Sequence, residues 1–283
     1  MAKSFSPLRY PGGKSKIYEK VKNLIIANGY GDRTYVEPFA GGFGIGIGLL
    51  HESIVPAAIL NDFDSHIYHF WYAVFNDTEN LLRLISDTPI TIEEREKQKQ
   101  NYNDADADAD PLTDGFATLF LNRVNFSGVI KGGPIGGLVQ SGTYKVDCRF
   151  NKKDIKNKIV AISQLKNKIK LYNKDAGYLI RMSLMKMKSP MFLNIDPPYV
   201  IKGSKLYKNF FTEGDHLNLQ RVITKHLDDE YPWIITYDDC TLVRELYNRF
   251  HIREYGIAHN AGGTVPGKEI VITNLPMDKF TWE

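Results

Sequence analysis

Cysteine is scarce in this chain, and long apolar runs are missing. Cys148 and Cys240 are the two cysteines in 283 residues and form no CxxC pair, so neither a disulfide framework nor a zinc knuckle is predicted. No window approaches the ~18 apolar residues that a membrane-spanning helix needs. The first residues, MAKSFSPLRYPGGK, lack the apolar stretch of a secretory signal. We therefore expect a protein of the reducing cytoplasm, without a membrane partner.

A large excess of charge of one sign is also missing. The chain has 36 Lys and Arg against 33 Asp and Glu, a formal net charge of +3. Its 43% hydrophobic and 24% charged residues exclude a disordered or fibrous protein and indicate one large globular domain, or one domain with an insertion. Basic residues gather between Lys145 and Lys170, which fits either contact with phosphates or a solvated helix face.

The order of apolar segments predicts an α/β fold. Five segments with strand character alternate with helical patterns, as in a parallel sheet covered by helices; they lie at 34–36, 57–60, 168–173, 191–196 and 233–238. The last two predicted strands, near 251–258 and 269–274, have no helix between them and are expected to pair antiparallel at the sheet edge. Helical and glycine-rich patterns replace this rhythm over 74–150. We predict a catalytic domain of residues 1–73 and 151–283, with residues 74–150 inserted as a mainly helical domain.

Acidic residues follow four of the predicted strands. They are Glu37, Asp62, Asp175 and Asp196. Ligands bind at the carboxyl ends of parallel strands, although each acid alone could instead cap a helix. Glycines surround the first of these turns without forming GxGxxG or GxxxxGK, which disfavours a dinucleotide or a nucleoside triphosphate. A carboxylate suited to ribose hydroxyls, without a phosphate cradle, fits S-adenosylmethionine.

The stretch NIDPPYV at 194–200 ends a buried strand in an unusual way. Two successive prolines stiffen the backbone and, because they have no N–H groups, leave nearby carbonyls for an external donor. A substrate amino group could give one hydrogen to the Asp196 carboxylate and the other to the Pro197 carbonyl. Tyr199 could then stack on a flipped base. The alternative is a simple turn from strand to loop.

Together these motifs resemble the Dam-type DNA adenine-N6 methyltransferases, over nearly the whole chain and in the order of that family. The segments that carry the resemblance are LRYPGGK at 8–14, VEPFAGGFG at 36–44, LNDFD at 60–64, FLNRVNFSG at 120–128, IDPPY at 195–199 and FFTEGDHLNLQ at 210–220. The resemblance implies a seven-stranded, Rossmann-like sheet that binds S-adenosylmethionine, an inserted target-recognition domain, and methylation of a flipped-out adenine in double-stranded DNA. The family usually has Trp in place of Tyr10 and often Arg in place of Lys131.

The resemblance and the strand ends together give a set of expected site residues. The expected catalytic residues are Asp196, Pro197, Pro198 and Tyr199. The expected S-adenosylmethionine ligands are Tyr10, Lys14, Glu37, Phe39, Gly41, Asp62, Asp175 and Asp196. In the insertion, residues that could reach base edges are Arg123, Asn125, Ser127 and Lys131, while Phe126 could wedge beside the extruded base. The alternatives there are core packing for Phe126 and a helix-terminal ion pair for Arg123.

Other readings of the sequence are weaker. No metal site is expected, and His66 and His69 are predicted to lie on the surface of a helix. An RNA or protein N-methyltransferase usually has Asn where Asp196 stands, and the missing GxGxxG weakens a nicotinamide dehydrogenase. A catalytically inactive DNA-binding protein of the same fold is a further alternative. The sequence leaves open which DNA site is methylated and whether a cognate restriction endonuclease accompanies the protein.

Overall fold

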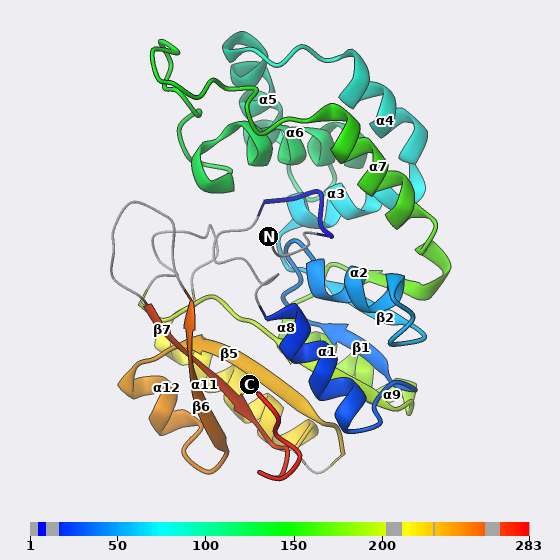
Figure 1. Cartoon of the computed structure of the whole chain (residues 1–283), viewed down its shortest axis with the longest axis vertical. Coiled ribbons are helices and arrows are strands. Elements are labelled where there is room, and N and C mark those ends of the chain that lie inside the picture. Colours follow the sequence, from blue (N-terminus) through cyan, green and yellow to red (C-terminus); the bar gives the residue numbers. More distant parts are fainter. Residues whose placement is uncertain (1–4, 10–16, 202–210, 229, 258–266, 283) are drawn as a thin grey trace. The chain divides into compact units, whose positions relative to one another are not determined.

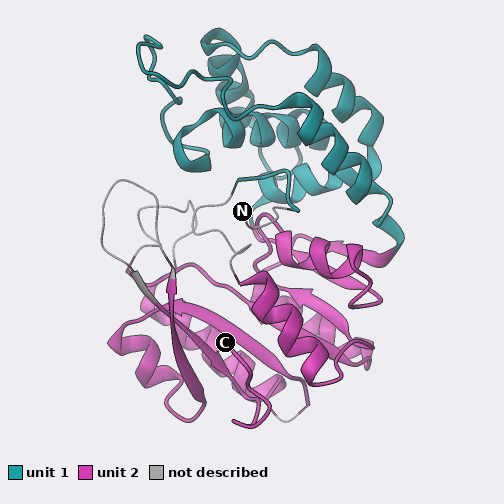
Figure 2. Ribbon diagram, viewed as in Figure 1, with its two compact units in different colours: residues 1–13, 64–167 teal, residues 14–63, 168–283 magenta. Residues whose placement is uncertain are grey.

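A computed structural model describes residues 5–9, 17–201, 211–228, 230–257 and 267–282. The chain divides into two compact units: unit 1 comprises residues 1–13 and 64–167, and unit 2 comprises residues 14–63 and 168–283 (Figure 2). Unit 1 thus begins earlier and ends later than the predicted insertion of residues 74–150. The difference arises because the helices at 65–76 and 152–163 pack with the inserted helices.

Unit 2 contains, among its described residues, a seven-stranded sheet in the order β3-β2-β1-β4-β5-β7-β6 (Figure 1). Its strands are β1 (Thr34–Glu37), β2 (Ala58–Asn61), β3 (Ile169–Tyr172), β4 (Met191–Ile195), β5 (Trp233–Asp238), β6 (His251–Ile257) and β7 (Gly267–Thr273). The pairs among β1 to β5 are parallel, whereas β7 runs antiparallel to both β5 and β6. The predicted α/β class and the antiparallel pair at the edge are confirmed.

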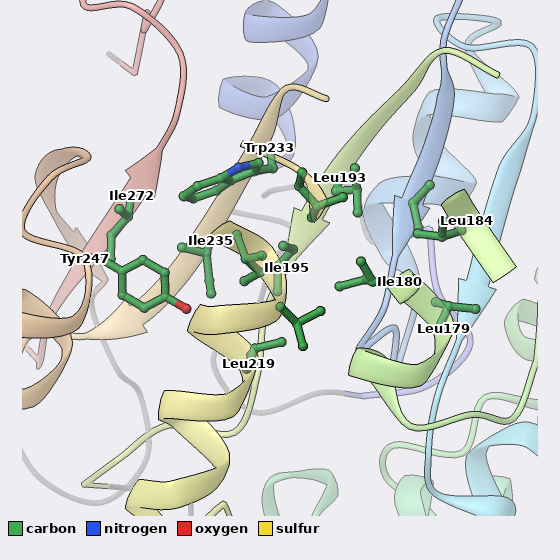
Figure 3. Close-up of a cluster of buried hydrophobic side chains, with 14 of the residues drawn as sticks. Leu179, Ile180, Leu184, Leu193, Ile195, Leu219, Trp233, Ile235, Tyr247 and Ile272 are labelled. Atoms are coloured by element: carbon green, nitrogen blue, oxygen red, sulfur yellow. The ribbon is translucent and has the colours of Figure 1, made fainter. Parts of the chain in front are cut away.

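The two central strands β4 and β5 are buried at every position, because both faces of the sheet are covered. On one face, Leu193 and Ile195 of β4 and Ile235 of β5 join a large apolar cluster with residues of several helices (Figure 3). Since side chains alternate along a strand, Asn194 and Thr236 belong to the opposite face. Asp196, the residue after β4, accepts a hydrogen bond from Thr236 of this second face.

The helices of unit 2 follow the strands. They are α1 (Tyr18–Ala27), α2 (Gly44–His51), α8 (Ala176–Tyr178), the π-helical turn η4 (Leu179–Leu184), α9 (Met185–Met187), α11 (Glu213–His226) and α12 (Thr241–Leu246). Thr212 and Asp215 form a capping box that fixes the start of α11. Gly46 of α2 is required because a Cβ there would lie 2.3 Å from the ring of Phe43.

The regular elements of unit 1, among its described residues, are helices, and residues 129–151 form irregular turns. Its elements are α3 (Ser65–Asn76), α4 (Thr78–Asp87), α5 (Ile92–Asp104), α6 (Pro111–Val124), η2 (Phe126–Gly128) and α7 (Lys152–Ser163), and η3 (Lys166–Lys168) lies where the chain passes back to unit 2. Asp64, Thr91, Asp110 and Asn151 cap the first turns of α3, α5, α6 and α7. Helices α3 and α6 approach closely at Gly115, where a Cβ would lie 2.7 Å from the carbonyl oxygen of His69.

Candidate active site

The ends of β1 and β2 are joined by a hydrogen bond between two predicted cofactor residues. The backbone N–H of Gly41, which has φ of +47°, donates to Oδ2 of Asp62 at 2.8 Å. This bond orients the Asp62 carboxylate, and the residue as a whole is half-buried. The next residue, Phe63, has 59% of its surface exposed. An acidic and an aromatic side chain are thus presented together after β2.

Glu37, at the end of β1, is buried and serves the start of α2. Its Oε1 accepts hydrogen bonds from the Tyr35 hydroxyl at 2.8 Å and from the Gly46 N–H at 3.3 Å. The Tyr35 hydroxyl in turn accepts from Nδ2 of Asn194 at 2.8 Å. A buried carboxylate at a helix N-terminus compensates for the absence of a capping side chain at Phe43. The structure therefore gives Glu37 a clear structural role, while its predicted contact with the cofactor stays a prediction.

The remaining predicted cofactor residues lie in different surroundings. Phe39 is half-buried, and its ring meets that of Phe211 edge to face with centroids 5.6 Å apart. Asp175 is exposed and caps α8 by accepting from the N–H of Tyr178 at 2.8 Å, which is the capping alternative that the sequence left open. Tyr10 and Lys14 lie outside the described residues.

The predicted catalytic residues follow β4 directly. Asp196 is half-buried, and its Oδ1 accepts a hydrogen bond from the Thr236 hydroxyl at 2.5 Å. Pro197 is buried and Pro198 half-buried. The Tyr199 ring packs partly against the apolar cluster, and its hydroxyl donates to Oε2 of Glu269 at 2.9 Å. The segment is therefore fixed by side chains of β5 and β7 as well as by its prolines.

Within unit 1, the asparagines of FLNRVNFSG are structural. Asn125 is fully buried; its Oδ1 accepts from Nε of Arg95 at 2.8 Å and its Nδ2 donates to the carbonyl of Ile130 at 2.6 Å. Both ends of the Asn125 amide are thus engaged within unit 1, and its predicted base contact stays a prediction. Asn122 holds the chain similarly, because its Nδ2 donates to the carbonyls of Arg9 and Gly128.

The other predicted DNA residues of unit 1 differ in exposure. Lys131 is exposed, and Phe126 has 62% of its surface exposed, so the core alternative for Phe126 does not apply. Ser127 is half-buried with φ of +54°. Burial, with the nearby Arg9 guanidinium, lowers the pKa of Arg123 to about 10. The Asp154 carboxylate raises this pKa and Arg149 lowers it, so Arg123 has two cationic neighbours and one acidic neighbour.

His66 and His69 are buried rather than exposed, so their predicted surface position is wrong. Nδ1 of each ring is 2.7 Å from a different carboxylate oxygen of Asp114 on α6. The ring of Tyr102 stacks on His66 with centroids 3.8 Å apart. Among the described residues, no group of three or more His, Cys, Asp or Glu side chains is arranged to hold a metal ion. The triad joins α3 to α6.

Comparison with known proteins identifies the family of this chain. A family model of the D12 class N6 adenine-specific DNA methyltransferases matches residues 10–256. The chain belongs to this family. Its activity is accordingly the methylation of adenine N6 in DNA, and the predicted resemblance and enzyme class are confirmed. Membership implies a methyl donor of the S-adenosylmethionine type and DNA as substrate, and it favours neither a dehydrogenase nor an RNA or protein methyltransferase.

Three comparisons of this methyltransferase with individual proteins show low sequence identity. Over 249 residues it is 24% identical to the retron Ec67 DNA adenine methylase of Escherichia coli, covering 86% of this chain and 80% of that protein. Two structures of the rRNA methyltransferase aviRa from Streptomyces viridochromogenes match 93% and 86% of this chain and 84% and 76% of theirs, with 12% and 11% identity. Their TM-scores are 0.39 and 0.32, values at which the likeness carries no argument.

Several residues near the candidate site were not among those predicted from the sequence. Asp238 ends β5, as Asp196 follows β4, and the rule that selects acids at strand ends would have found it. Thr236 and Glu269 carry no such signal, because they lie inside predicted strands whose pairing the sequence does not specify. Phe63 directly follows the predicted Asp62, and only its exposed ring in the structure singles it out as a candidate.

Among the described helices, none has both the length and the apolar character to cross a bilayer.

Proposed function

We propose that this enzyme transfers the methyl group of S-adenosylmethionine to an adenine flipped out of double-stranded DNA, with Asp196, Pro197 and Tyr199 holding the base. The observation that carries the proposal is the position of Asp196–Tyr199 at the carboxyl end of β4, next to β1, whose turn contacts Asp62 at the end of β2. In a parallel sheet this edge is where ligands bind. The family match supplies the reaction, and the strand ends supply the residues.

The chain's own residues act on the amino group of adenine. The N6 lone pair is delocalised into the ring, so the amine is a poor nucleophile. The Asp196 carboxylate and the Pro197 carbonyl are acceptors for its two hydrogens, and bonding to both favours the pyramidal nitrogen that can attack. The partly exposed ring of Tyr199 offers a face on which the extruded base can stack. Exclusion of water by the bound base would strengthen each of these hydrogen bonds.

The residues present also fit the cofactor. The half-buried Asp62 carboxylate suits a pair of ribose hydroxyls, and the glycine turn lets the backbone approach a ligand closely. Phe39, the exposed Phe63 and the acids Glu37 and Asp175 lie at or near the same strand ends. When bound, S-adenosylmethionine supplies an electrophilic methyl group on a sulfonium centre. Tyr10 and Lys14 complete the proposed site on the strength of the sequence alone.

Unit 1 is proposed to recognise the DNA target. Arg9, Arg123 and Arg149 carry like charges close enough that Arg149 lowers the pKa of both Arg9 and Arg123, after the larger effect of burial. Such a group is suited to a phosphate, which would relieve the repulsion. The exposed Lys131, the half-buried Ser127 and the exposed Phe126 remain candidates for contact with bases. The target-recognition domain proposed from the sequence, residues 74–150, lies within this unit.

The proposal is tested by expressing the protein in a host without DNA methylation and mapping N6-methyladenine on its genome by single-molecule sequencing. We expect one short sequence to be modified, with no modification by the Asp196→Ala variant. Methylation by that variant at the wild-type level would overturn the assigned site. The same map gives the sequence on which cleavage by a cognate restriction endonuclease would be assayed, and that assay tests a restriction-modification role. A DNA substrate and the two free thiols of Cys148 and Cys240 support a cytoplasmic location.

A further inference from the structure

Three buried side chains on β5 and β7 hold the catalytic segment 196–201 from one side. Thr236, Asp238 and Glu269 are 1%, 3% and 1% exposed. Thr236 is two residues before Asp238 on β5, so the two side chains share a face of the sheet. Glu269 lies directly opposite Asp238 in the β5–β7 ladder, which brings it to that face as well. We call these three residues the β5–β7 cradle.

Each member of the cradle contacts a different part of the segment. The Thr236 hydroxyl donates to Oδ1 of Asp196 at 2.5 Å. Asp238 binds the backbone of the segment: its Oδ1 accepts from the N–H of Val200 at 3.0 Å, and its Oδ2 accepts from the N–H of Ile201 at 2.8 Å. These bonds fix the rotation of the Asp196 carboxylate and the path of the chain just beyond the proline pair.

Glu269 fixes the aromatic end of the segment. Its Oε2 accepts from the Tyr199 hydroxyl at 2.9 Å and from the Tyr255 hydroxyl at 3.1 Å. Burial, followed by the nearby Glu269 carboxylate, raises the pKa of Tyr255, so this phenol stays protonated and remains a donor. The Tyr199 side chain is consequently held in two ways: its ring packs against the apolar cluster, and its hydroxyl donates to the Glu269 carboxylate.

Burying Asp238 and Glu269 side by side destabilises the fold unless hydrogen-bond donors reach both carboxylates. Asp238 and Glu269 are two acids directly opposite each other in adjacent strands, and like charges in such pairs destabilise a sheet. A buried carboxylate also requires hydrogen bonds to offset its lost hydration. Here the donors come largely from Tyr199, Val200 and Ile201, within or next to the catalytic motif. In this conformation the segment donates two hydrogen bonds to Asp238 and one to Glu269, which also accepts from Tyr255, so the segment offsets part of the cost of burying both acids.

We propose that Thr236 is a positioning residue for Asp196, and that Asp238 and Glu269 lock the rest of the segment in the conformation that methyl transfer requires. The inference rests on the proposed role of Asp196 at the methyl-transfer step. The cradle touches neither the adenine nor the cofactor in this account and acts only through the residues it holds. Its effect should fall on the rate of transfer rather than on the affinity for either substrate.

The test compares Thr236→Val, which keeps the shape but removes the hydroxyl, with Thr236→Ser, which keeps the hydroxyl. Single-turnover methyl transfer to a DNA duplex that contains the mapped site is measured with the full-length enzyme. Because small misplacements of a reacting group cost up to ~100-fold, we expect Thr236→Val to be at least ~10-fold slower and Thr236→Ser to stay within ~3-fold of wild type. The dissociation constants for S-adenosylmethionine and DNA should change by less than ~2-fold in both variants.

Two further variants separate the outcomes. If Thr236 acts through Asp196, adding Thr236→Val to Asp196→Ala should cause no further loss of rate, whereas an additional ~10-fold loss would contradict the inference. An Asp196→Ala enzyme at the wild-type rate would refute the proposed function itself. A slow Asp196→Ala enzyme with a normal Thr236→Val rate would refute only the inference.

The Glu269 arm has its own test, which also serves if Thr236→Val fails to fold. Tyr199→Phe keeps the ring and removes the hydroxyl that Glu269 binds. We expect transfer to slow by ~3- to 10-fold with unchanged affinity for S-adenosylmethionine, as for the loss of one modest hydrogen bond. A rate within ~2-fold of wild type would show that Glu269 does not position the ring.

Discussion

The backbone N–H of Gly41 and the carboxylate of Asp62 are joined by a hydrogen bond of 2.8 Å between the ends of β1 and β2. Gly41 adopts φ of +47°, a conformation that favours glycine, so the turn that supplies this donor depends on the residue type. The bond orients the Asp62 carboxylate within the protein alone. The proposed ribose site is in this sense preorganised, and removing the Asp62 carboxylate should lower the affinity for S-adenosylmethionine.

Asp62→Ala should weaken S-adenosylmethionine without changing which DNA sequence is methylated. Removing charge-assisted hydrogen bonds worth ~1.5–3 kcal/mol predicts a loss of roughly 10- to 150-fold in affinity, measured by calorimetry. Asp32→Ala removes an exposed acid of the same unit and should leave the titration unchanged. An unaltered dissociation constant in the Asp62 variant would remove this residue from the cofactor site.

Asp196→Ala should abolish methyl transfer, because the carboxylate is a proposed acceptor for the adenine amine. We expect a single-turnover rate at least ~100-fold below wild type, the lower end of what positioned polar groups supply. DNA binding, measured by fluorescence anisotropy, should largely survive, since phosphate contacts dominate it. A variant that keeps half of the wild-type rate would be incompatible with the mechanism.

Asp114→Ala should destabilise unit 1, because it leaves the buried rings of His66 and His69 without their shared carboxylate. A buried polar group without a partner costs ~1–3 kcal/mol, and here two are created. Urea unfolding should therefore begin at a clearly lower concentration. Asp108→Ala, an exposed acid in the loop before α6, should change the midpoint little. Equal midpoints for the two variants would mean that the triad contributes nothing to stability.

His216 on α11 should make the stability of unit 2 depend on pH. Burial lowers its pKa below the ordinary value of 6.5, and the smaller effects of Asp238 and Asp215 oppose this. The folded state therefore binds the proton less readily than the unfolded chain. The neutral ring stabilises the fold fully above about pH 6.5, and this contribution is lost as pH falls toward the lowered pKa.

The corresponding experiment is urea unfolding of wild type and His216→Phe at pH 7.5, 6.5 and 5.5. Phenylalanine keeps the ring contacts with Phe211 and Tyr237 but cannot be protonated. One proton accounts for up to ~1.4 kcal/mol of unfolding free energy per pH unit. We expect the wild-type free energy to fall more steeply than that of the variant below pH 6.5. Parallel curves would exclude His216 as the source.

The sequence predicts the sheet better than it predicts side-chain environments. Strand WIITYD has the same bounds in the structure as in the prediction, because a buried run before a turn is a strong local signal. The surface prediction for His66 and His69 fails because nothing in their own segment indicates that Asp114, 45 residues later for His69, lies on the facing helix. The burial of Asn125 could not be predicted for the same reason, because its hydrogen-bond partner Arg95 is distant in sequence.

Lys131 and Arg149 provide a matched pair for deciding how unit 1 reads DNA. Both side chains are exposed, but Arg149 is coupled electrostatically to Arg9 and Arg123 whereas Lys131 follows the FLNRVNFSG motif in a glycine-rich segment. If the Lys131 ammonium donates to guanine O6 and N7, Lys131→Ala should cost ~1–3 kcal/mol on the preferred site and hardly alter binding to unrelated DNA. If Arg149 contacts a phosphate, Arg149→Ala should weaken binding to every sequence alike.

The measurement is binding and methylation of the matched duplex and of singly substituted duplexes at two salt concentrations. For Arg149→Ala the slope of affinity against salt should drop by about one, because one fewer counterion is released. For Lys131→Ala the slope should stay nearly constant while discrimination at one base pair relaxes. A uniform loss on all duplexes for both variants would make Lys131 a second phosphate contact. With Asn125 buried, the base-specific contact would then have to come from Ser127, Arg123 or the exposed Phe126.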